Sequence, residues 1–301
     1  MDCVSIKHFL EQSNIDFTEN EPIGRHTSFK TGGKADIFIV AKNADDLSAL
    51  LIFCNKNEVP ITLLGNGSNV LVSDKGIRGV VISLAAMNTL AYDGELVKAD
   101  GGTPLTALCN FALENSLSGL EFAFGIPGSV GGAVVMNAGA YGGEIKDVLY
   151  DCAIMNSNGD THILSAEELK LGYRTSLLKT DGGILLWARF RLNQANKADI
   201  KAKMVELFSR RKEKQPLEFP SAGSTFKRPK GYFAGALIES CGLKGKRIGG
   251  AMVSEKHAGF VINYDNATAN DIKELISFIQ ETVLKEHGVL LEKEVIYIGE
   301  E

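Results

Sequence analysis

The pattern of apolar and polar positions predicts an alternation of strands and helices. Residues 36–42 and 184–192 alternate with a period of two, which is typical of half-buried strands. Residues 44–57 instead repeat apolar positions at helical spacing, behind acidic residues of the first turn. Short apolar runs at 59–65 and 80–84 are typical of buried strands. These segments predict a compact β-α-β lobe in the first third of the chain.

Capping residues mark two further helices. Thr103 and Pro104 open one, with the proline at the first helical position that it favours. In the last helix, Thr268 and Asp271 have the spacing of a capping box, and Gly288 ends the periodic run. The other predicted elements are helices at 5–13, 198–215 and 234–241, and strands at 96–99, 151–164 and 290–299.

Length, charge and cysteine usage narrow the class of protein. The 301 residues are enough for about two ordinary domains, and a polar stretch at 193–197 predicts a boundary. The net charge of −5 argues against a nucleic-acid binder with a basic surface. No basic leader or apolar run of membrane-spanning length occurs. The five cysteines form no CxxC pair, which predicts reduced thiols in a cytoplasmic protein without a metal site.

Two glycine-rich loops are the candidate binding elements, namely LGNGSNV at 64–70 and GIPGSVGGAVVMNAGA at 125–140. The first loop does not complete a GxGxxG motif, because position 70 is valine and strands are predicted after it. The second loop does not form a GxSxG motif, because Ser129 follows Pro127 and Gly128. Glycine lets the backbone adopt positive φ and approach a ligand, and successive N–H groups can bind an anion. The loops therefore indicate either a diphosphate site or tight turns and close strand packing.

Six segments in order resemble the UDP-N-acetylenolpyruvoylglucosamine reductase family, and the resemblance runs from about His26 to Gly299. The segments are LGNGSNVLVSDKGIRGVVI, GIPGSVGGAVVMNAGAYGGEI, YRTSLLK, SAGSTFKRP, SCGLKGKRIGGAMVSEKHAGFVIN and LEKEVIYIG. The tight connection after YRTS resembles the shorter type of the family, which lacks an inserted substrate-capping loop.

The resemblance implies an α+β fold with a two-lobed FAD-binding module of the vanillyl-alcohol-oxidase/p-cresol-methylhydroxylase type. The implied lobes are residues 1–84 and 85–195, followed by a C-terminal α+β substrate-binding domain at 196–301. FAD would be held without a covalent bond. The implied FAD contacts are Leu64, Gly65, Asn66, Gly67, Ser68, Asn69, Pro127, Gly128, Ser129, Gly132, Ala133 and Asn137.

The reaction implied by the resemblance is the NADPH-dependent reduction of UDP-N-acetylglucosamine enolpyruvate to UDP-N-acetylmuramate, in peptidoglycan precursor synthesis. Arg174 would bind the substrate carboxylate, Ser224 would deliver a proton, and Glu294 would assist. Taken by themselves, an arginine at a strand edge and a serine between glycine and threonine are also typical of a surface ion pair and a turn. Strand parity with Ile296 and Ile298 predicts an inward-facing Glu294 carboxylate.

The resemblance also implies substrate contacts at Tyr173, Lys227, Arg228 and Lys244, where basic side chains would hold the diphosphate. Arg228 departs from the family pattern, in which asparagine is common after that lysine. The expected partner is a UDP-sugar bound by a cytoplasmic monomer, without nucleic acid or membrane. Two alternatives stay open: a related FAD oxidase that passes electrons to oxygen, and a non-enzymatic UDP-sugar sensor.

Overall fold

The computed structural model describes residues 3–300, which form two compact units. Unit 1 comprises the described residues up to Thr18, together with Ile37–Asn66 and Gly79–Arg210. Unit 2 comprises Glu19–Asp36, Gly67–Arg78 and the described residues from Arg211 onward.

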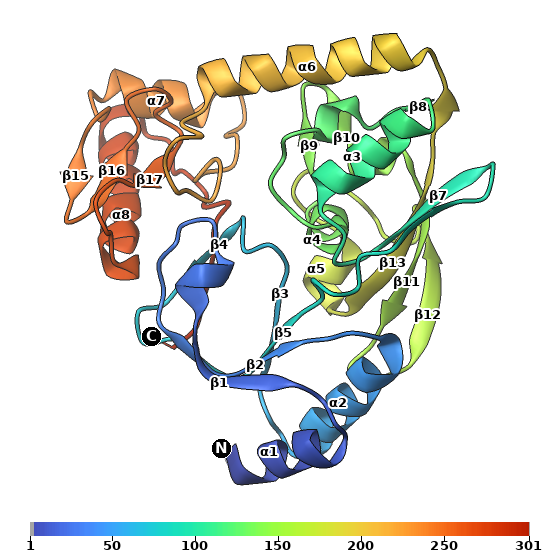
Figure 1. Ribbon diagram of the computed structural model, residues 1–301. Helices are drawn as coiled ribbons and strands as arrows, with labels where there is room; N and C mark the ends of the chain where they lie inside the picture. The colour runs from blue at the N-terminus through green and yellow to red at the C-terminus, as the bar shows by residue number, and fades with distance from the viewer. Residues whose placement is uncertain (1–2, 301) are drawn as a thin grey trace. The chain divides into compact units, whose positions relative to one another are not determined.

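Helices and strands both contribute, as an α+β fold requires (Figure 1). The helices are α1 Cys3–Gln12, α2 Ala44–Lys56, α3 Leu105–Glu114, α4 Val130–Val135, α5 Leu177–Asp181, α6 Lys197–Lys214, α7 Ala234–Ser240 and α8 Ala269–His287. The strands are β1 Phe17–Pro22, β2 Lys34–Val40, β3 Ile61–Leu64, β4 Val70–Val72, β5 Ile77–Ser83, β6 Leu90–Tyr92, β7 Leu96–Asp100, β8 Leu117–Ser118, β9 Gly139–Ala140, β10 Gly143–Glu144, β11 Leu149–Met155, β12 Thr161–Ser165, β13 Ile184–Arg191, β14 Asn193–Gln194, β15 Arg247–Ile248, β16 Ala251–Val253, β17 Val261–Asn263 and β18 Ile296–Ile298.

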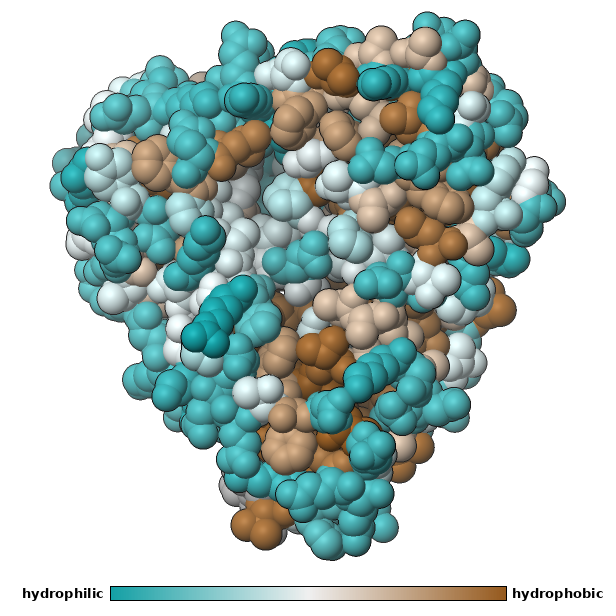
Figure 2. Space-filling model, viewed as in Figure 1, coloured by the Kyte–Doolittle hydropathy of each residue, from teal (hydrophilic) through white to brown (hydrophobic). Residues whose placement is uncertain are grey.

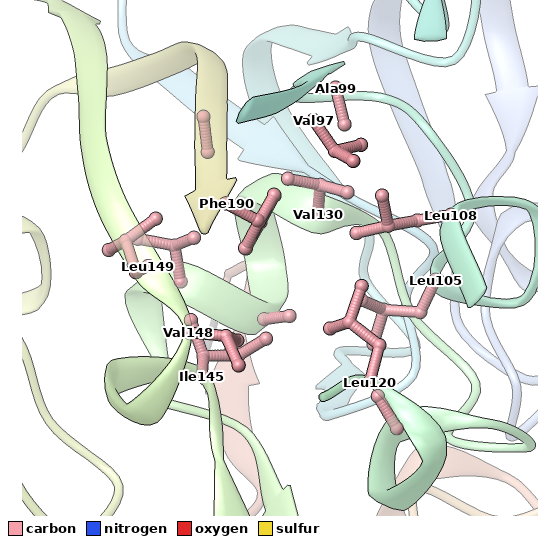
Figure 3. Close-up of a cluster of buried hydrophobic side chains, with 14 of the residues drawn as sticks. Val97, Ala99, Leu105, Leu108, Leu120, Val130, Ile145, Val148, Leu149 and Phe190 are labelled. Carbon is pink, nitrogen blue, oxygen red and sulfur yellow. The ribbon is translucent and has the colours of Figure 1, made fainter. Parts of the chain in front are cut away.

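The main sheet of unit 1 has five antiparallel strands in the order β12-β11-β13-β7-β6. Helix α4 packs against β13 and β7, and its residue Val130 is fully buried. Figure 3 shows Val130 between Phe190 of β13 and Leu108 of α3. The burial of these side chains fixes α4 on the sheet, and α4 in turn carries part of the candidate site.

Unit 2 contains the antiparallel sheet β15-β16-β17, on which α8 packs, and the parallel pair of β18 with β4. The predicted capping box of α8 is confirmed, since Thr268 and Asp271 bond each other's backbone N–H at 3.0 Å. Gly288 ends the helix in the left-handed conformation, with φ of 67°. Satisfied backbone groups at both ends stabilise this helix.

Two sequence-based expectations about local structure are wrong. Pro104 is the N-cap of α3, with extended φ of −60° and ψ of 136°, and the helix begins at Leu105. The strand expected at 290–299 is a strand only at Ile296–Ile298. Glu294 lies outside this short strand, so strand parity does not predict its direction. Ile296, on the face expected to point inward, is 37% exposed, while Val295 is buried.

The surface has the polar character expected of a globular chain. Figure 2 shows hydrophilic side chains over much of the visible face, with hydrophobic ones between them in smaller groups. Of the helices described, none has the length and apolar character needed to span a membrane. No group of three or more potential metal-binding side chains occurs within residues 3–300.

We expect Thr103→Val to stabilise the protein. Thr103 is fully buried where its carbonyl accepts the N–H of Val130 at 2.8 Å, but its Oγ1 has no hydrogen-bond partner in the described structure. Valine keeps the shape and removes the unsatisfied hydroxyl, so the free energy of unfolding should rise by about 1 kcal/mol. Denaturant unfolding measures this, and a loss of stability would show that the hydroxyl has a partner.

Candidate active site

The two glycine-rich loops come together within unit 1. A Cβ atom on Gly65, directly after β3, would lie 2.9 Å from Oγ of Ser129. Ser129 is the N-cap of α4, and its Oγ accepts the N–H of Gly132 at 3.3 Å. A side chain at position 65 would require the Ser129 hydroxyl to move, so the two loops lie close together at this point.

Gly131 and Gly132, at the start of α4, differ in what surrounds them. A Cβ on Gly131 would lie 3.0 Å from the carbonyl oxygen of Gly101, which is tighter than ordinary packing. A Cβ on Gly132 would have Ser129 Oγ at 3.5 Å as its nearest neighbour, an ordinary van der Waals distance. The protein thus leaves room for a methyl group at 132, although alanine is the better helix former. A bare backbone at that position fits the approach of a bound group such as FAD.

The other half of the first loop belongs to unit 2. Gly67 has φ of 59°, and a Cβ there would collide with the carbonyl of His26. Asn69 donates from Nδ2 to the carbonyl of Glu294 at 3.2 Å, and its own carbonyl accepts the N–H of Ile296 at 3.0 Å. These bonds attach the end of the loop to the segment that contains Glu294.

Thr225 joins the segments of Ser224 and Glu294 within unit 2. Its N–H donates to the carbonyl of Gly259, and its carbonyl accepts the N–H of Glu294, both at 2.9 Å. Its buried Oγ1 accepts the N–H of Val261 at 3.0 Å. Ser224 is exposed and Glu294 is half-buried. The structure therefore places the predicted proton donor and the predicted assisting acid on paired backbone segments.

His257 bonds Gly259, the residue whose carbonyl accepts the Thr225 N–H. Its Nδ1 accepts the N–H of Gly259 at 3.0 Å, which requires a neutral ring nitrogen. Burial is the main cause that lowers the pKa of His257, and this favours the neutral form. This backbone hydrogen bond gives His257 a structural role.

Arg174 lies in unit 1, in a tight turn. Gly172 and Thr175 bond each other, N–H to carbonyl, at 3.0 and 3.3 Å, and Tyr173 and Arg174 form the corner between them. Arg174 has φ of 56°, and its guanidinium lies 5.3 Å from the ring centre of Tyr173. Tyr173 is 56% exposed. Tyr173 is therefore exposed at the turn, whereas Arg174 is half-buried.

Four of the predicted FAD residues have buried side chains, namely Leu64, Ser129, Ala133 and Asn137. Leu64 and Ala133 belong to the apolar interior, so only their backbones are available to a cofactor. Asn137 is 1% exposed and donates from Nδ2 to Glu144 Oε2 at 2.5 Å and to the carbonyl of Gly172 at 3.1 Å. Both amide hydrogens of Asn137 are therefore bonded within the protein.

The basic residues predicted to bind substrate have partners within unit 2. Lys227 forms an ion pair with Glu292, and Lys244 forms one with Glu239 at 2.6 Å. The guanidinium of Arg228 lies 4.1 Å from the ring centre of Phe233. Both lysines are therefore paired with neighbouring carboxylates.

Family models match most of the chain. Residues 35–165 match an FAD-binding domain, and residues 215–298 match the C-terminal domain of UDP-N-acetylenolpyruvoylglucosamine reductase. The reductase of that name from Caldanaerobacter subterraneus subsp. tengcongensis is 51% identical over 295 residues, which are 98% of this chain and 97% of the relative. The chain belongs to the UDP-N-acetylenolpyruvoylglucosamine reductase family.

Other reductases of the family agree with this assignment. The protein from Clostridium botulinum strain Hall is also 51% identical, over 98% of both chains. The crystal structure of the reductase from Thermus caldophilus superposes with a TM-score of 0.81 at 37% identity, covering 94% of this chain and 98% of that one. The resemblance, the α+β fold and the FAD-binding oxidoreductase module predicted from the sequence are thereby confirmed.

Sequence analysis did not show which residues position the candidate site, and it named Asn137 only as an FAD contact. Thr225, Gly172 and the side chain of Asn137 make the bonds that place Ser224, Glu294 and Arg174. Thr225 and Asn137 lie in segments that match the family, but those segments alone do not separate a residue that contacts a ligand from one that positions it.

We expect Gly132→Ala to have opposite effects on the protein without FAD and on its affinity for FAD. The methyl group fits the protein and favours helix, so the free energy of unfolding without FAD should rise by about 0.5–1 kcal/mol. The same methyl would meet a cofactor lying on this backbone and weaken binding about tenfold or more. Unfolding curves and FAD titration measure the two effects.

Gly131→Ala is the matched control for this experiment. Its methyl would press on the carbonyl of Gly101, so it should lose stability whether or not FAD is added. Unchanged FAD affinity in the Gly132 variant would place the cofactor elsewhere.

Proposed function

We propose that this chain reduces UDP-N-acetylglucosamine enolpyruvate to UDP-N-acetylmuramate with NADPH, as a step in peptidoglycan precursor synthesis. The supporting observation is the pairing of the Ser224 and Glu294 segments through Thr225. The chain is also similar over nearly its full length to UDP-N-acetylenolpyruvoylglucosamine reductases. That pairing supplies a hydroxyl and a carboxyl group on adjacent segments, which suits proton delivery.

The glycine-rich loops would hold FAD, which when bound supplies the hydride for the reaction. The predicted contacts are the loop residues 64–69 together with Pro127, Gly128, Ser129 and Gly132. Leu64 and Ala133 would contribute only backbone. Ser68 carries a half-buried hydroxyl group that can donate to a diphosphate, while the buried Ser129 hydroxyl caps α4.

Arg174 would bind the substrate carboxylate. Hydride addition to the outer carbon of the enolpyruvyl group moves negative charge toward a carboxylate that is already negative. A fixed guanidinium stabilises that charge, and its planar fork matches both carboxylate oxygens. The tight turn at Gly172–Thr175 holds the Arg174 backbone before substrate arrives.

Ser224 would give a proton to the inner carbon, and Glu294 would assist. Serine is a weak acid, so its O–H needs a neighbouring group that stabilises the transfer. The bond from Glu294 N–H to the carbonyl of Thr225 keeps the two segments in register for this purpose. Lys227, Arg228 and Lys244 would hold the diphosphate, and Tyr173 would line the substrate pocket.

The proposal includes the setting in which the chain acts. The chain would work as a cytoplasmic monomer, without nucleic-acid or membrane partners. Its domains would be two FAD-binding lobes, 1–84 and 85–195, and a substrate-binding domain, 196–301. Cys54, Cys109, Cys152 and Cys241 are free, which supports a reducing compartment. The acidic net charge of −5 supports the expectation of no nucleic-acid partner.

We expect Ser224→Ala to separate the two half-reactions. Bleaching of bound flavin by NADPH should stay within about twofold, because it needs no proton from Ser224. Reoxidation by the enolpyruvyl substrate should slow about 100-fold or more, which is typical of a lost general acid. Anaerobic stopped-flow absorbance measures both rates.

Ser277→Ala, at an exposed serine of α8 in the same unit, is the control and should leave both rates unchanged. Equal slowing of both half-reactions in the Ser224 variant would contradict the assigned role. A wild-type chain reoxidised by air but not by substrate would favour the oxidase. A chain that binds UDP-sugar without oxidising NADPH would favour the sensor.

A further inference from the structure

We propose that Asn137 is a positioning residue, whose side-chain amide holds the turn that presents Arg174 to the substrate carboxylate. This inference rests on the function proposed above. Asn137 was predicted to contact FAD. Under this inference its side-chain amide instead acts on the reaction through the position of Arg174.

The turn needs support because Arg174 has an unfavourable backbone conformation. Its φ of 56° lies in the left-handed region, which a long side chain adopts at a cost in energy. The reciprocal bonds of Gly172 and Thr175 close the turn but do not attach it to the rest of unit 1. The attachment at Gly172 comes from Asn137, whose Nδ2 donates to the Gly172 carbonyl at 3.1 Å.

Asn137 is itself held from both sides. Its Oδ1 accepts the N–H of Lys146 at 2.9 Å, and its second amide hydrogen goes to Glu144 Oε2 at 2.5 Å. The side chain is 1% exposed, so water cannot readily replace these bonds. Only a group with two donors and an acceptor on one short side chain makes all three contacts.

A second contact fastens the same turn to α4. Ser176 Oγ donates to the carbonyl of Val135, the last residue of the helix, at 2.7 Å. Ser129 of the glycine-rich loop caps the other end of this six-residue helix. The loop expected to hold FAD and the turn that carries Arg174 are therefore fixed to opposite ends of one short helix.

The test uses Asn137→Gly in the holoenzyme. Asn137 has φ of 41°, which glycine adopts easily, so this change removes the amide without straining the backbone. We expect flavin reduction by NADPH within about twofold of wild type. Reoxidation by the enolpyruvyl substrate should slow about tenfold to 100-fold, as expected when a reacting group is displaced by about 1 Å.

Asn115→Gly is the matched control. Asn115 caps the end of α3 in the same unit, and its Nδ2 donates to the carbonyl of Phe111 at 2.8 Å. The variant loses the same type of bond, but within the described residues the Asn115 side chain makes no hydrogen bond to the turn, so both half-reactions should stay unchanged. Asn137→Asp is a second variant, which keeps the shape and the Oδ1 acceptor but cannot donate to Gly172; it should slow reoxidation in the same way.

A double-mutant cycle separates positioning from a general loss of structure. If Asn137 acts through Arg174, adding Asn137→Gly to Arg174→Ala should slow reoxidation no further than Arg174→Ala alone. Amide hydrogen exchange gives a readout besides activity: the N–H groups of Gly172 and Thr175, which close the turn, should exchange faster in Asn137→Gly.

The outcomes are distinct. Slowed reoxidation in both Asn137 variants, no further loss in the double variant and faster exchange at the turn would support the inference. The inference would be overturned if the rate losses of Asn137→Gly and Arg174→Ala multiply in the double variant. Reoxidation at the wild-type rate in the Asn137 variants, or equal slowing of both half-reactions, would also overturn it. Failure of wild-type enzyme to be reoxidised by the substrate would instead overturn the proposed function.

Discussion

The short helix α4 is the constraint on which the candidate site of unit 1 depends. Val130 is buried between α3 and the main sheet, which fixes the helix in place. Ser129 caps its first turn, and the Val135 carbonyl at its end accepts a bond from Ser176. Because a six-residue helix has little freedom when both ends and one face are held, it sets the spacing between the glycine-rich loop and the Arg174 turn. The apolar core of unit 1 therefore helps to position the candidate site.

Unit 2 uses backbone pairing for the same purpose. The peptide groups of Thr225 bond Gly259 on one side and Glu294 on the other, and its hydroxyl is fully buried between them. Asn69 attaches the glycine-rich loop to the carbonyl of Glu294. In each unit a buried polar residue, Asn137 or Thr225, bonds the backbone segment that carries a candidate site residue. The candidate side chains are themselves less buried, since Ser224 is exposed and Arg174 and Glu294 are half-buried.

Much of the fold was predictable because its signals are local. The capping box and terminal glycine of α8, the periodicity of α2 and the alternation in β13 each depend on residues close in sequence. The errors arise where tertiary contacts override the local pattern. Pro104 is extended because its segment bridges to Ser129, and residues 290–295 follow loop contacts such as the bridge of Phe226 with Lys293.

The candidate site was predictable from motifs only as a set of residues. Motifs named Arg174, Ser224 and Glu294, but the left-handed backbone of Arg174 and its attachment through Gly172 depend on residues 35 positions apart in sequence. The glycines show the same limit. A Cβ on Gly67 would collide with backbone atoms, while Gly132 has room for one, and only the folded chain separates these cases.

The measurement that tests the account most directly is an anaerobic spectral titration of the wild-type chain with FAD bound. NADPH is added until the flavin bands bleach, and UDP-N-acetylglucosamine enolpyruvate is then added in stoichiometric amount. The account predicts prompt bleaching, followed by recovery of the oxidised bands and formation of UDP-N-acetylmuramate. Bleaching without recovery on addition of the substrate would contradict it.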